Sequence, residues 1–399
     1  MRFSRRTNWN TEESDLARAL RNRRSAGLPI ADLTASNPTR SHFVYPASLL
    51  EALANPRALD YDPQPKGLLP ARQAVSDYYS RHGAAVDTGQ IILTTSTSEA
   101  YSFLFRLLCD PGSEILIFQP GYPLFDFLAA LDDVTLKPVP LVYDRGWQID
   151  VETIRRAISD QTRAIVIVHP NNPTGHFTKP WEIAELAKIC RAFHLSLIVD
   201  EVFLDYAHGN PGHFLANSFA AGIEGVPVFV VSGLSKIAAL PQMKAAWIVA
   251  TGPESGAALE RLEVVADTFL SMNAPVQWAL PAWLESAQKI QNQIRARVAS
   301  NLSFLDRCLP AVPAVERLAL EGGWYALLRI PALQPDEQTV LALLDRGVWA
   351  HPGYFFSLPA SGWLILSLLA PQLEFSHGLD TLINYLRKDQ ESNTEEGVL

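Results

Sequence analysis

Short apolar runs alternate with helical patterns along most of this 399-residue chain, and this rhythm restricts its fold more than any other feature. Ile165–Val168 and Val228–Val231 carry branched apolar residues on consecutive positions, which is typical of strands buried on both faces of a mostly parallel sheet. Helical patterns at Ser98–Leu108 and Pro180–Phe193 lie between such runs, as in βαβ units. The predicted strands are Ile91–Thr95, Glu114–Phe118, Val134–Val139, Arg163–Val168, Leu195–Val199, Val228–Val231 and Trp247–Ala250.

The pattern changes after about Asn273, where a long predicted helix, Val276–Cys308, is followed by a few strands and helices. We therefore expect an α/β protein in which a large domain with a mostly parallel, seven-stranded sheet is joined to a smaller α+β domain. The expected limits are an N-terminal arm and small-domain segment at 1–45, the large domain at 46–275, the small domain at 276–390 and a tail at 391–399.

Charge and cysteine content favour a small-molecule partner. Lys and Arg together number 33 against 42 acidic residues, and the net charge of -9 comes without any basic stripe that would suit nucleic acid. No apolar run is long enough to cross a bilayer, and no secretory signal is recognisable, so no membrane partner is expected. The three cysteines are far apart and set in apolar surroundings, which favours free thiols and a cytoplasmic location.

Four of the apolar runs end directly in polar or special residues. In open α/β sheets ligands bind outside the carboxyl ends of the strands, so we expect the four clusters to meet in one crevice. The clusters are Thr94–Ser98, His169–Gly175, Asp200–Glu201 and Ser232–Lys236.

Two charged residues of these clusters stand in apolar surroundings. Asp200 follows a buried strand, where a carboxylate is costly without a cationic partner; a structural ion pair or a helix cap is the alternative role. Lys236 is flanked by Ile237 and Ala238, and a desolvated lysine has a lowered pKa and forms imines as a nucleophile. A lysine taken alone is more often a surface residue, so the interpretation depends on the two occurring together at strand ends.

The other two clusters suit an anion and a turn. Thr97 and Ser98 open a predicted helix, whose free N–H groups attract anions, although either residue could simply be the N-cap. Asn172–Gly175 is a turn by composition, and turns need no function. The chain contains neither a dinucleotide-binding fingerprint nor a P-loop, and its nine histidines lack metal-ligand spacing, so we expect no metal site.

Taken in order, these clusters resemble the class I/II aminotransferases, the fold-type I enzymes that depend on pyridoxal 5′-phosphate (PLP). The strongest segments are Asn171–Gly175, Asp200–Phe203 and Ser232–Lys236, within a likeness that runs from about Leu33 to Leu386. The resemblance implies the PLP-dependent transferase fold type I, with PLP as the cofactor. It also implies that Lys236 forms a Schiff base with PLP, Asp200 pairs with the protonated ring nitrogen, and Asn172 donates to the ring's O3′.

The same resemblance implies roles for further residues. Thr97 and Ser98, with Ser235, would hold the phosphate, and Lys244 occupies the place of the usual phosphate-binding arginine. Tyr122 is similar to the aromatic residue that stacks on the ring, although without the family it would be a packed core tyrosine. Tyr61 is similar to a tyrosine that reaches the phosphate of the neighbouring subunit, so the resemblance implies a homodimer with shared active sites.

Two departures from the family pattern bear on chemistry and substrate. Phe203 stands where the family usually has a tyrosine that donates to O3′, so we expect the Schiff base to have a raised pKa. Ile365 stands where an arginine usually grips the α-carboxylate of the substrate. Either another cation binds this group, for which Arg40 is a candidate, or the substrate has no carboxylate there.

The sequence is interpreted as a PLP-dependent aminotransferase that moves an amino group from an amino acid or amine to a 2-oxo acid. Because Ile365 replaces the arginine that usually binds the substrate carboxylate, a PLP-dependent C–S lyase that acts by β-elimination is an alternative. A further alternative is a non-catalytic protein that uses the same fold to bind a ligand. Neither the donor, the acceptor nor the pathway follows from the sequence, because this fold hosts many chemistries.

Overall fold

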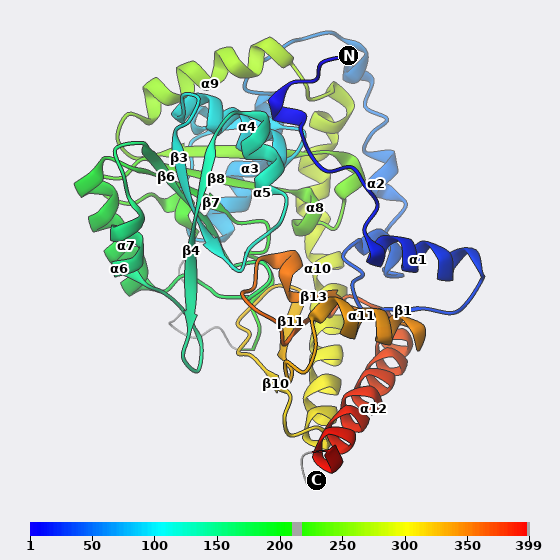
Figure 1. Ribbon diagram of the computed structural model, residues 1–399. Helices are drawn as coiled ribbons and strands as arrows, with labels where there is room; N and C mark the ends of the chain where they lie inside the picture. The colour runs from blue at the N-terminus through cyan, green and yellow to red at the C-terminus, as the bar shows by residue number, and fades with distance from the viewer. Residues whose placement is uncertain (210–217, 397–399) are drawn as a thin grey trace. The chain divides into compact units, whose positions relative to one another are not determined.

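The computed structural model describes residues 1–209 and 218–396 of the chain (Figure 1). The chain divides into two compact units. The first consists of Met1–Asn8, Val44–Asn292 and Glu321–Gly323, and the second of Trp9–Phe43, Gln293–Leu320 and Trp324–Leu399. For comparison, the large domain was expected to begin at 46 and to end at 275. The domain limits expected from the sequence remain a prediction.

The first unit is built on an eight-stranded sheet with the order β2-β9-β8-β7-β6-β3-β4-β5. Neighbouring strands from β8 to β4 run parallel, whereas β9 is antiparallel to both of its neighbours and β5 is antiparallel to β4. The strands are β2 (Ile91–Thr94), β3 (Glu114–Gln119), β4 (Thr135–Tyr143), β5 (Trp147–Ile149), β6 (Thr162–Val168), β7 (Ser196–Asp200), β8 (Val228–Gly233) and β9 (Ala246–Thr251).

All seven predicted strands are present, and the sheet has one strand more than the seven expected. The additional strand, β5, has only 3 residues and pairs with the end of β4. A run this short gives no recognisable period in the sequence. The correction affects only the edge of the sheet and not the mostly parallel centre that the consecutive apolar residues predicted.

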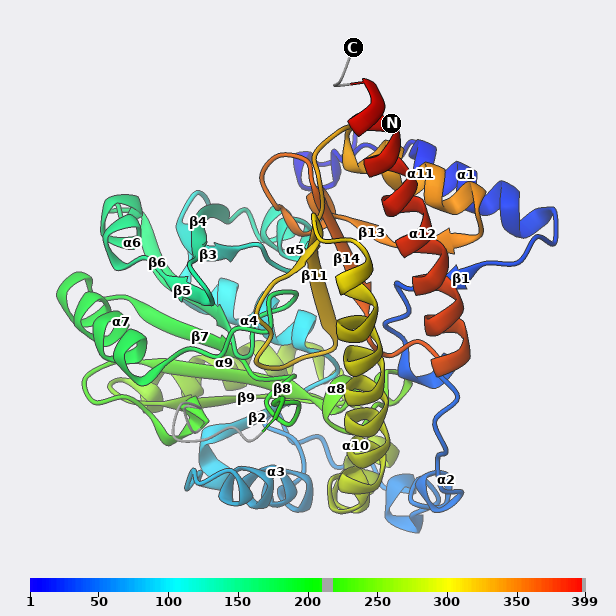
Figure 2. The same cartoon turned by 90° about the horizontal axis from the view of Figure 1, so that it is seen from below.

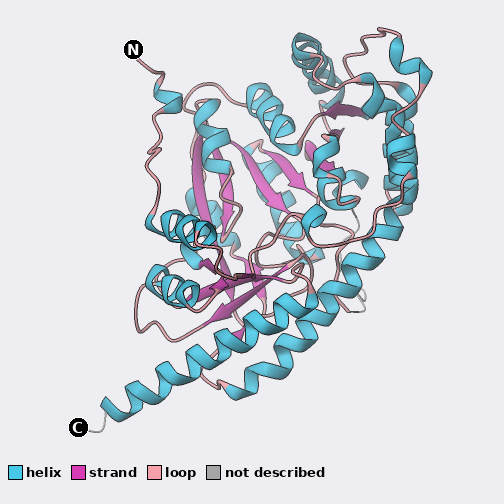
Figure 3. Ribbon diagram, turned by 90° about the vertical axis from the view of Figure 1, so that its right-hand side faces the viewer, coloured by secondary structure: helices cyan, strands magenta, loops and turns pink. Residues whose placement is uncertain are grey.

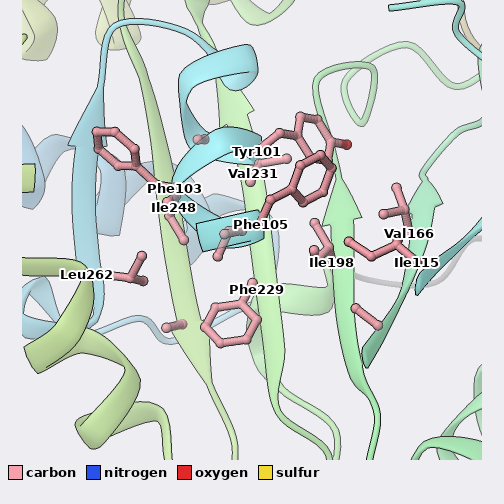
Figure 4. Packing of buried hydrophobic residues seen from close by; sticks show 14 of the residues in the cluster. Tyr101, Phe103, Phe105, Ile115, Val166, Ile198, Phe229, Val231, Ile248 and Leu262 are labelled. Atoms are coloured by element: carbon pink, nitrogen blue, oxygen red, sulfur yellow. The ribbon is translucent and has the colours of Figure 1, made fainter. Parts of the chain in front are cut away.

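One face of this sheet is covered by helices α4 (Thr97–Leu108), α5 (Phe125–Leu131) and α9 (Ser255–Phe269). Figure 4 shows how aromatic residues of α4 pack between these helices and the strands. Tyr101, Phe103 and Phe105 of α4 contact the same buried cluster as Ile198 of β7 and Val231 of β8. This apolar packing fixes the start of α4 beside the carboxyl ends of the central strands.

The remaining helices of the first unit follow the βαβ rhythm. The two predicted segments at Ser98–Leu108 and Pro180–Phe193 are both helical. The other helices are α2 (Ser48–Glu51), α3 (Leu69–Arg81), α6 (Val151–Ala157), α7 (Pro180–Phe193), α8 (Leu234–Ile237) and α10 (Ala274–Cys308), the last of which continues into the second unit.

The second unit contains two small sheets and long helices (Figures 2 and 3). One sheet has the order β10 (Glu316–Arg317), β11 (Tyr325–Arg329), β14 (Trp363–Ser367) and β13 (His351–Pro352), all antiparallel. The other pairs β1 (Ala31–Asp32) with β12 (Val348–Trp349) in parallel. The helices are α1 (Asp15–Ser25), α11 (Asp336–Asp345) and α12 (Gln372–Glu396).

Helix α12 ends at Glu396 and so includes the first residues of the polar tail that was predicted from residue 391. No proline or glycine interrupts the sequence between Gly378 and Gly397, so nothing stops the helix earlier. Residues 397–399 of the predicted tail lie outside the described residues. Among the described helices, none is long and apolar enough to cross a membrane.

Candidate active site at the carboxyl edge of the sheet

The four polar clusters do meet at one edge of the large sheet. Strands β6, β7 and β8 are parallel neighbours, so Val168, Asp200 and Gly233 end at the same edge. Strand β9 separates β2 from β8, but Thr94 of β2 and Gly233 of β8 are both paired with Ala246. The convergence predicted from the strand ends is therefore confirmed.

Lys236 lies in the short helix α8, directly after β8, and its side chain is partly buried. Burial lowers the pKa of its amine to about 8, against the opposing effect of the Asp200 charge. The amine nitrogen lies 5.6 Å from the centre of the Phe203 ring. Tyr206 donates its hydroxyl to the backbone oxygen of Lys236 at 2.7 Å, which ties α8 to the segment after β7. The lysine is thus a desolvated amine on a fixed backbone.

Asp200 ends β7 and is only 8% exposed. Its Oδ1 accepts the backbone N–H of Val202 at 3.0 Å, and its Oδ2 accepts the hydroxyl of Tyr101 at 3.2 Å. Burial raises the pKa of this carboxyl to about 6, although both hydrogen bonds and the Lys236 charge act in the opposite direction. A carboxylate held in this way is ready to bind a buried cation.

Asn172 lies in the turn that follows β6 and is buried. The turn is held by its neighbour: Asn171 Oδ1 accepts the hydroxyl of Thr174 at 2.8 Å, and the N–H of Gly175 donates to Asn171 O at 2.8 Å. Within the described residues, Asn172 Oδ1 has no hydrogen-bond partner. A buried amide with an unmet hydrogen-bonding group is expected where a ligand completes the site.

The start of α4 is capped by Ser96, whose Oγ accepts the N–H of Glu99 at 3.1 Å. This corrects the alternative that Thr97 or Ser98 serves as the cap. Both residues are partly exposed in the first turn. Their hydroxyls and the free N–H groups of that turn form the kind of site that attracts an anion.

Several predicted cofactor contacts lie nearer to the surface. Ser235 is partly buried in α8, and Lys244 is exposed in a left-handed conformation with φ 51°. Tyr122 is 45% exposed, with its ring edge-on to Phe125 at 6.4 Å. Tyr61 is 86% exposed. Tyr122 is therefore not the packed core tyrosine that was the alternative interpretation.

Arg40 and Ile365 belong to the second unit. Arg40 is exposed and ends a short 3-10 helix, Pro38–Arg40. Ile365 is fully buried in β14, where it is paired with Leu327 on one side and His351 on the other. The isoleucine therefore fills an apolar position within its own unit.

Sequence reasoning overlooked Tyr101 and Tyr206, the two hydroxyls that contact Asp200 and Lys236. Tyr101 lies four positions after Thr97, so a helical wheel would have placed it on the same face. Nothing in the sequence fixes its partner, however, because the hydrogen bond spans 99 residues.

Known proteins resemble this chain over nearly its whole length. The family described as Aminotransferase class I and II matches residues 32–372. The chain is 28% identical to the alanine aminotransferase of Mycobacterium tuberculosis over 375 residues, covering 90% of this chain and 86% of that protein. It is 30% identical to the S-alkyl-thiohydroximate lyase of Arabidopsis thaliana over 247 residues, covering 61% of this chain and 53% of that protein.

Solved structures agree on the fold. The alanine aminotransferase from Pyrococcus furiosus superposes with a TM-score of 0.88 at 23% identity, covering 97% of this chain and 100% of that one. An aspartate aminotransferase double mutant from Thermus thermophilus gives a TM-score of 0.83 at 25% identity, covering 96% of this chain and 100% of that one.

Proposed function

Because the chain belongs to the class I and II aminotransferases, whose members depend on PLP, we propose that Lys236 is the residue that holds the cofactor. The activity is amino transfer from an amino acid or amine to a 2-oxo acid. The observation that carries the proposal for the site is the desolvated amine of Lys236 at the same sheet edge as the buried carboxylate of Asp200.

The residues present fit PLP. The ring nitrogen is a cation when protonated, and Asp200 is a buried carboxylate whose ionised form needs such a partner. Asn172 offers a buried amide whose Nδ2 can donate to the ring oxygen, while its Oδ1, an acceptor, lacks a partner among the described residues. The first turn of α4 offers N–H groups and two hydroxyls for a phosphate. Together they provide complementary groups for the ring nitrogen, the ring oxygen and the phosphate.

When bound, PLP supplies an electron sink for the electron pair left at the substrate Cα. The protein's part is to hold groups and to move one proton. Nζ of Lys236, with its lowered pKa, would be the nucleophile that holds the cofactor and the base that moves the Cα proton. Asp200 would keep the ring nitrogen protonated, and Asn172 would orient the ring by donating from its amide.

The remaining contacts follow from the same arrangement. Thr97, Ser98 and Ser235 would bind the phosphate through their hydroxyls, and Lys244 would add a single positive charge where an arginine would offer two parallel donors. Tyr122 would contact the ring, which agrees with its partial exposure. Phe203 places an apolar ring near Nζ of Lys236 and has no hydroxyl to donate to the ring oxygen.

The proposal extends to a homodimer with shared active sites, in which Tyr61 contacts the phosphate bound by the partner. In support, Tyr61 is exposed on a cavity of about 520 Å³ that lies wholly in the first unit. Large apolar side chains are also exposed close by in the sequence, among them Leu59 and Leu69. A cytoplasmic location is part of the proposal, since all three cysteines are free thiols.

The α-carboxylate of an amino acid donor needs a cationic partner in the site. Ile365 cannot bind it, and Arg40 is the candidate cation. Replacing Arg40 by Ala should raise KM for an amino acid donor about tenfold or more, whereas an amine donor without a carboxylate should be unaffected. An unchanged KM for both donors would rule Arg40 out.

A C–S lyase is a second candidate because the Arabidopsis relative is named as a lyase and because Ile365 replaces the arginine that usually binds the substrate carboxylate. The two activities are separated by following the nitrogen. With pyruvate and a ¹⁵N-labelled amino acid mixture that lacks alanine, an aminotransferase yields labelled alanine, detectable by mass spectrometry. A lyase instead releases ammonia and pyruvate from cysteine-like substrates and labels no acceptor.

A further inference from the structure

Tyr101 connects the core of the large unit to the proposed cofactor site. It lies on α4 and is 3% exposed, with its ring edge-on to Phe125 at 5.0 Å and 6.0 Å from Phe105. Figure 4 shows the ring above the central strands, beside Phe105. Packing on these aromatic neighbours fixes the ring, so the direction of the hydroxyl is fixed as well. The hydroxyl donates to Oδ2 of Asp200 at 3.2 Å.

The two carboxylate oxygens of Asp200 accept from different donors, and Tyr101 donates to only one of them. The N–H of Val202 donates to the other oxygen, Oδ1, at 3.0 Å. Burial raises the pKa of Tyr101 well above its usual value, so the hydroxyl keeps its proton and acts on Asp200 as a donor. The other charges that act on this carboxyl are Lys236, from α8, which favours its ionised form, and the neighbouring Glu201.

Donors to a carboxylate make it a weaker base, because they stabilise the ionised form. When a carboxylate and a ring nitrogen share a proton, a weaker base leaves the proton on the nitrogen. We propose that Tyr101 is a positioning residue for the cofactor, whose hydroxyl holds Asp200 ionised and oriented so that the proton stays on the ring nitrogen of PLP. This inference rests on the proposed function, in which Asp200 pairs with that nitrogen.

The alternative is that Tyr101 only fills the core, and Tyr101→Phe separates the two roles. The variant keeps the ring and its contacts with Phe125 and removes only the hydroxyl. Wild type and variant are reconstituted with PLP labelled with ¹⁵N at the ring nitrogen. We expect the ¹⁵N resonance to move from the protonated towards the neutral position. Loss of a hydrogen bond to a charged group should also raise Kd for PLP about tenfold.

The matched control is Tyr78→Phe. Tyr78 is also a buried tyrosine that donates to a carboxylate, but its partner is Asp205, at 2.9 Å. The control should leave both the ¹⁵N resonance and Kd at their wild-type values. If Tyr101→Phe also leaves both unchanged, Tyr101 is a packing residue and the inference fails.

A second variant covers the case in which Tyr101→Phe does not fold. A 3-fluorotyrosine placed at position 101 keeps the packing and has a more acidic hydroxyl, which donates more strongly. Kd for PLP should then fall below the wild-type value while the ¹⁵N resonance stays at the protonated position; an unchanged Kd, or a shift of the resonance towards neutral, would overturn the inference. Failure of wild type to bind PLP at all would instead contradict the proposed function, so the two failures are distinguishable.

Discussion

Loss of contact with water shifts the pKa values of Lys236 and Asp200 in opposite directions, because one residue is a cation and the other an anion. It lowers the pKa of Lys236 to about 8 and raises that of Asp200 to about 6. Each group is therefore closer to losing its charge near neutral pH than it would be in water. For the lysine this means a larger fraction of uncharged amine at neutral pH. For the aspartate it means that a cationic ring nitrogen would offset the free-energy cost of keeping the buried carboxylate ionised. Both effects come from one desolvated edge of the sheet.

The apolar ring at position 203 should be visible in the spectrum of the bound cofactor. In Phe203→Tyr, a hydroxyl near Lys236 would donate to the ring oxygen and stabilise the deprotonated form of the cofactor linkage. We expect the pH at which the visible absorbance changes to fall by about 1 unit. A spectrophotometric pH titration of both proteins measures this. A midpoint that is unchanged or higher in the variant would contradict the role given to Phe203.

Glu201, the neighbour of Asp200, should make stability depend on pH. It is fully buried and accepts from Ser218 Oγ at 2.7 Å and from the N–H of Phe219 at 2.6 Å, while burial raises its pKa from 4.5 to about 7. Between these values the folded protein retains a proton that the unfolded chain has released. The unfolding free energy should therefore fall as pH rises from about 4.5 to 7.

The substitution Glu201→Gln removes this titration. The decrease in unfolding free energy between pH 5 and pH 7 should then be smaller than in wild type by on the order of 2 kcal/mol. Urea unfolding at pH 5 and pH 7 gives the two free energies for each protein. Glu152→Gln, at an exposed position on α6, is the control and should keep the wild-type slope. Equal slopes in Glu201→Gln and wild type would show that Glu201 does not titrate as described.

At the scale of elements, the junction between β8 and α8 positions Lys236. Gly233 ends β8 and lies so close to β9 that an added Cβ would be 2.8 Å from Ala246 Cβ and 2.9 Å from Ala245 O. The N–H of Leu234 donates to the same Ala245 oxygen at 2.9 Å. A side chain at 233 would therefore push α8 and β9 apart, and Lys236 would move with α8.

We expect Gly233→Ala to lower the free energy of unfolding by about 1–3 kcal/mol and to weaken PLP binding. Gly256→Ala in α9 is the control, because an added Cβ there meets no atom within 4 Å. It should cost no stability. Thermal unfolding and PLP titration measure both effects, and a Gly233→Ala variant as stable as the control would refute this account of the junction.

Elements whose burial shows in the local sequence could be predicted. The parallel strands β6, β7 and β8 are apolar along their centres and largely buried, and the polar residues at their carboxyl ends identified the site. The strand β5 was not predicted because it is too short to show a hydrophobic period. The hydrogen bond from Tyr101 to Asp200 was not predicted because it depends on how α4 packs on the sheet. The cap at Ser96 was missed by one position, within the usual uncertainty of helix ends.

At the scale of the whole molecule, shared active sites make a prediction that a self-sufficient subunit does not. Lys236→Ala removes the lysine, and Tyr61→Ala removes the residue proposed to act on the partner's phosphate. A mixed dimer of the two variants has one site in which both residues are present. Co-refolding the two variants should therefore restore activity well above that of either alone, while sedimentation shows a dimer. No gain on mixing would contradict shared sites.

The central claim is that Lys236 holds PLP and transfers amino groups through it. The most direct test is the absorbance spectrum of the purified protein with PLP, recorded for wild type, Lys236→Ala and, as a control at an exposed lysine of α7, Lys188→Ala, before and after adding a mixture of amino donors. We expect a visible band in wild type and Lys188→Ala that is lost to a pyridoxamine spectrum on adding donor and restored by a 2-oxo acid, with no such band in Lys236→Ala. A band of equal intensity in Lys236→Ala, or none in wild type, would contradict it.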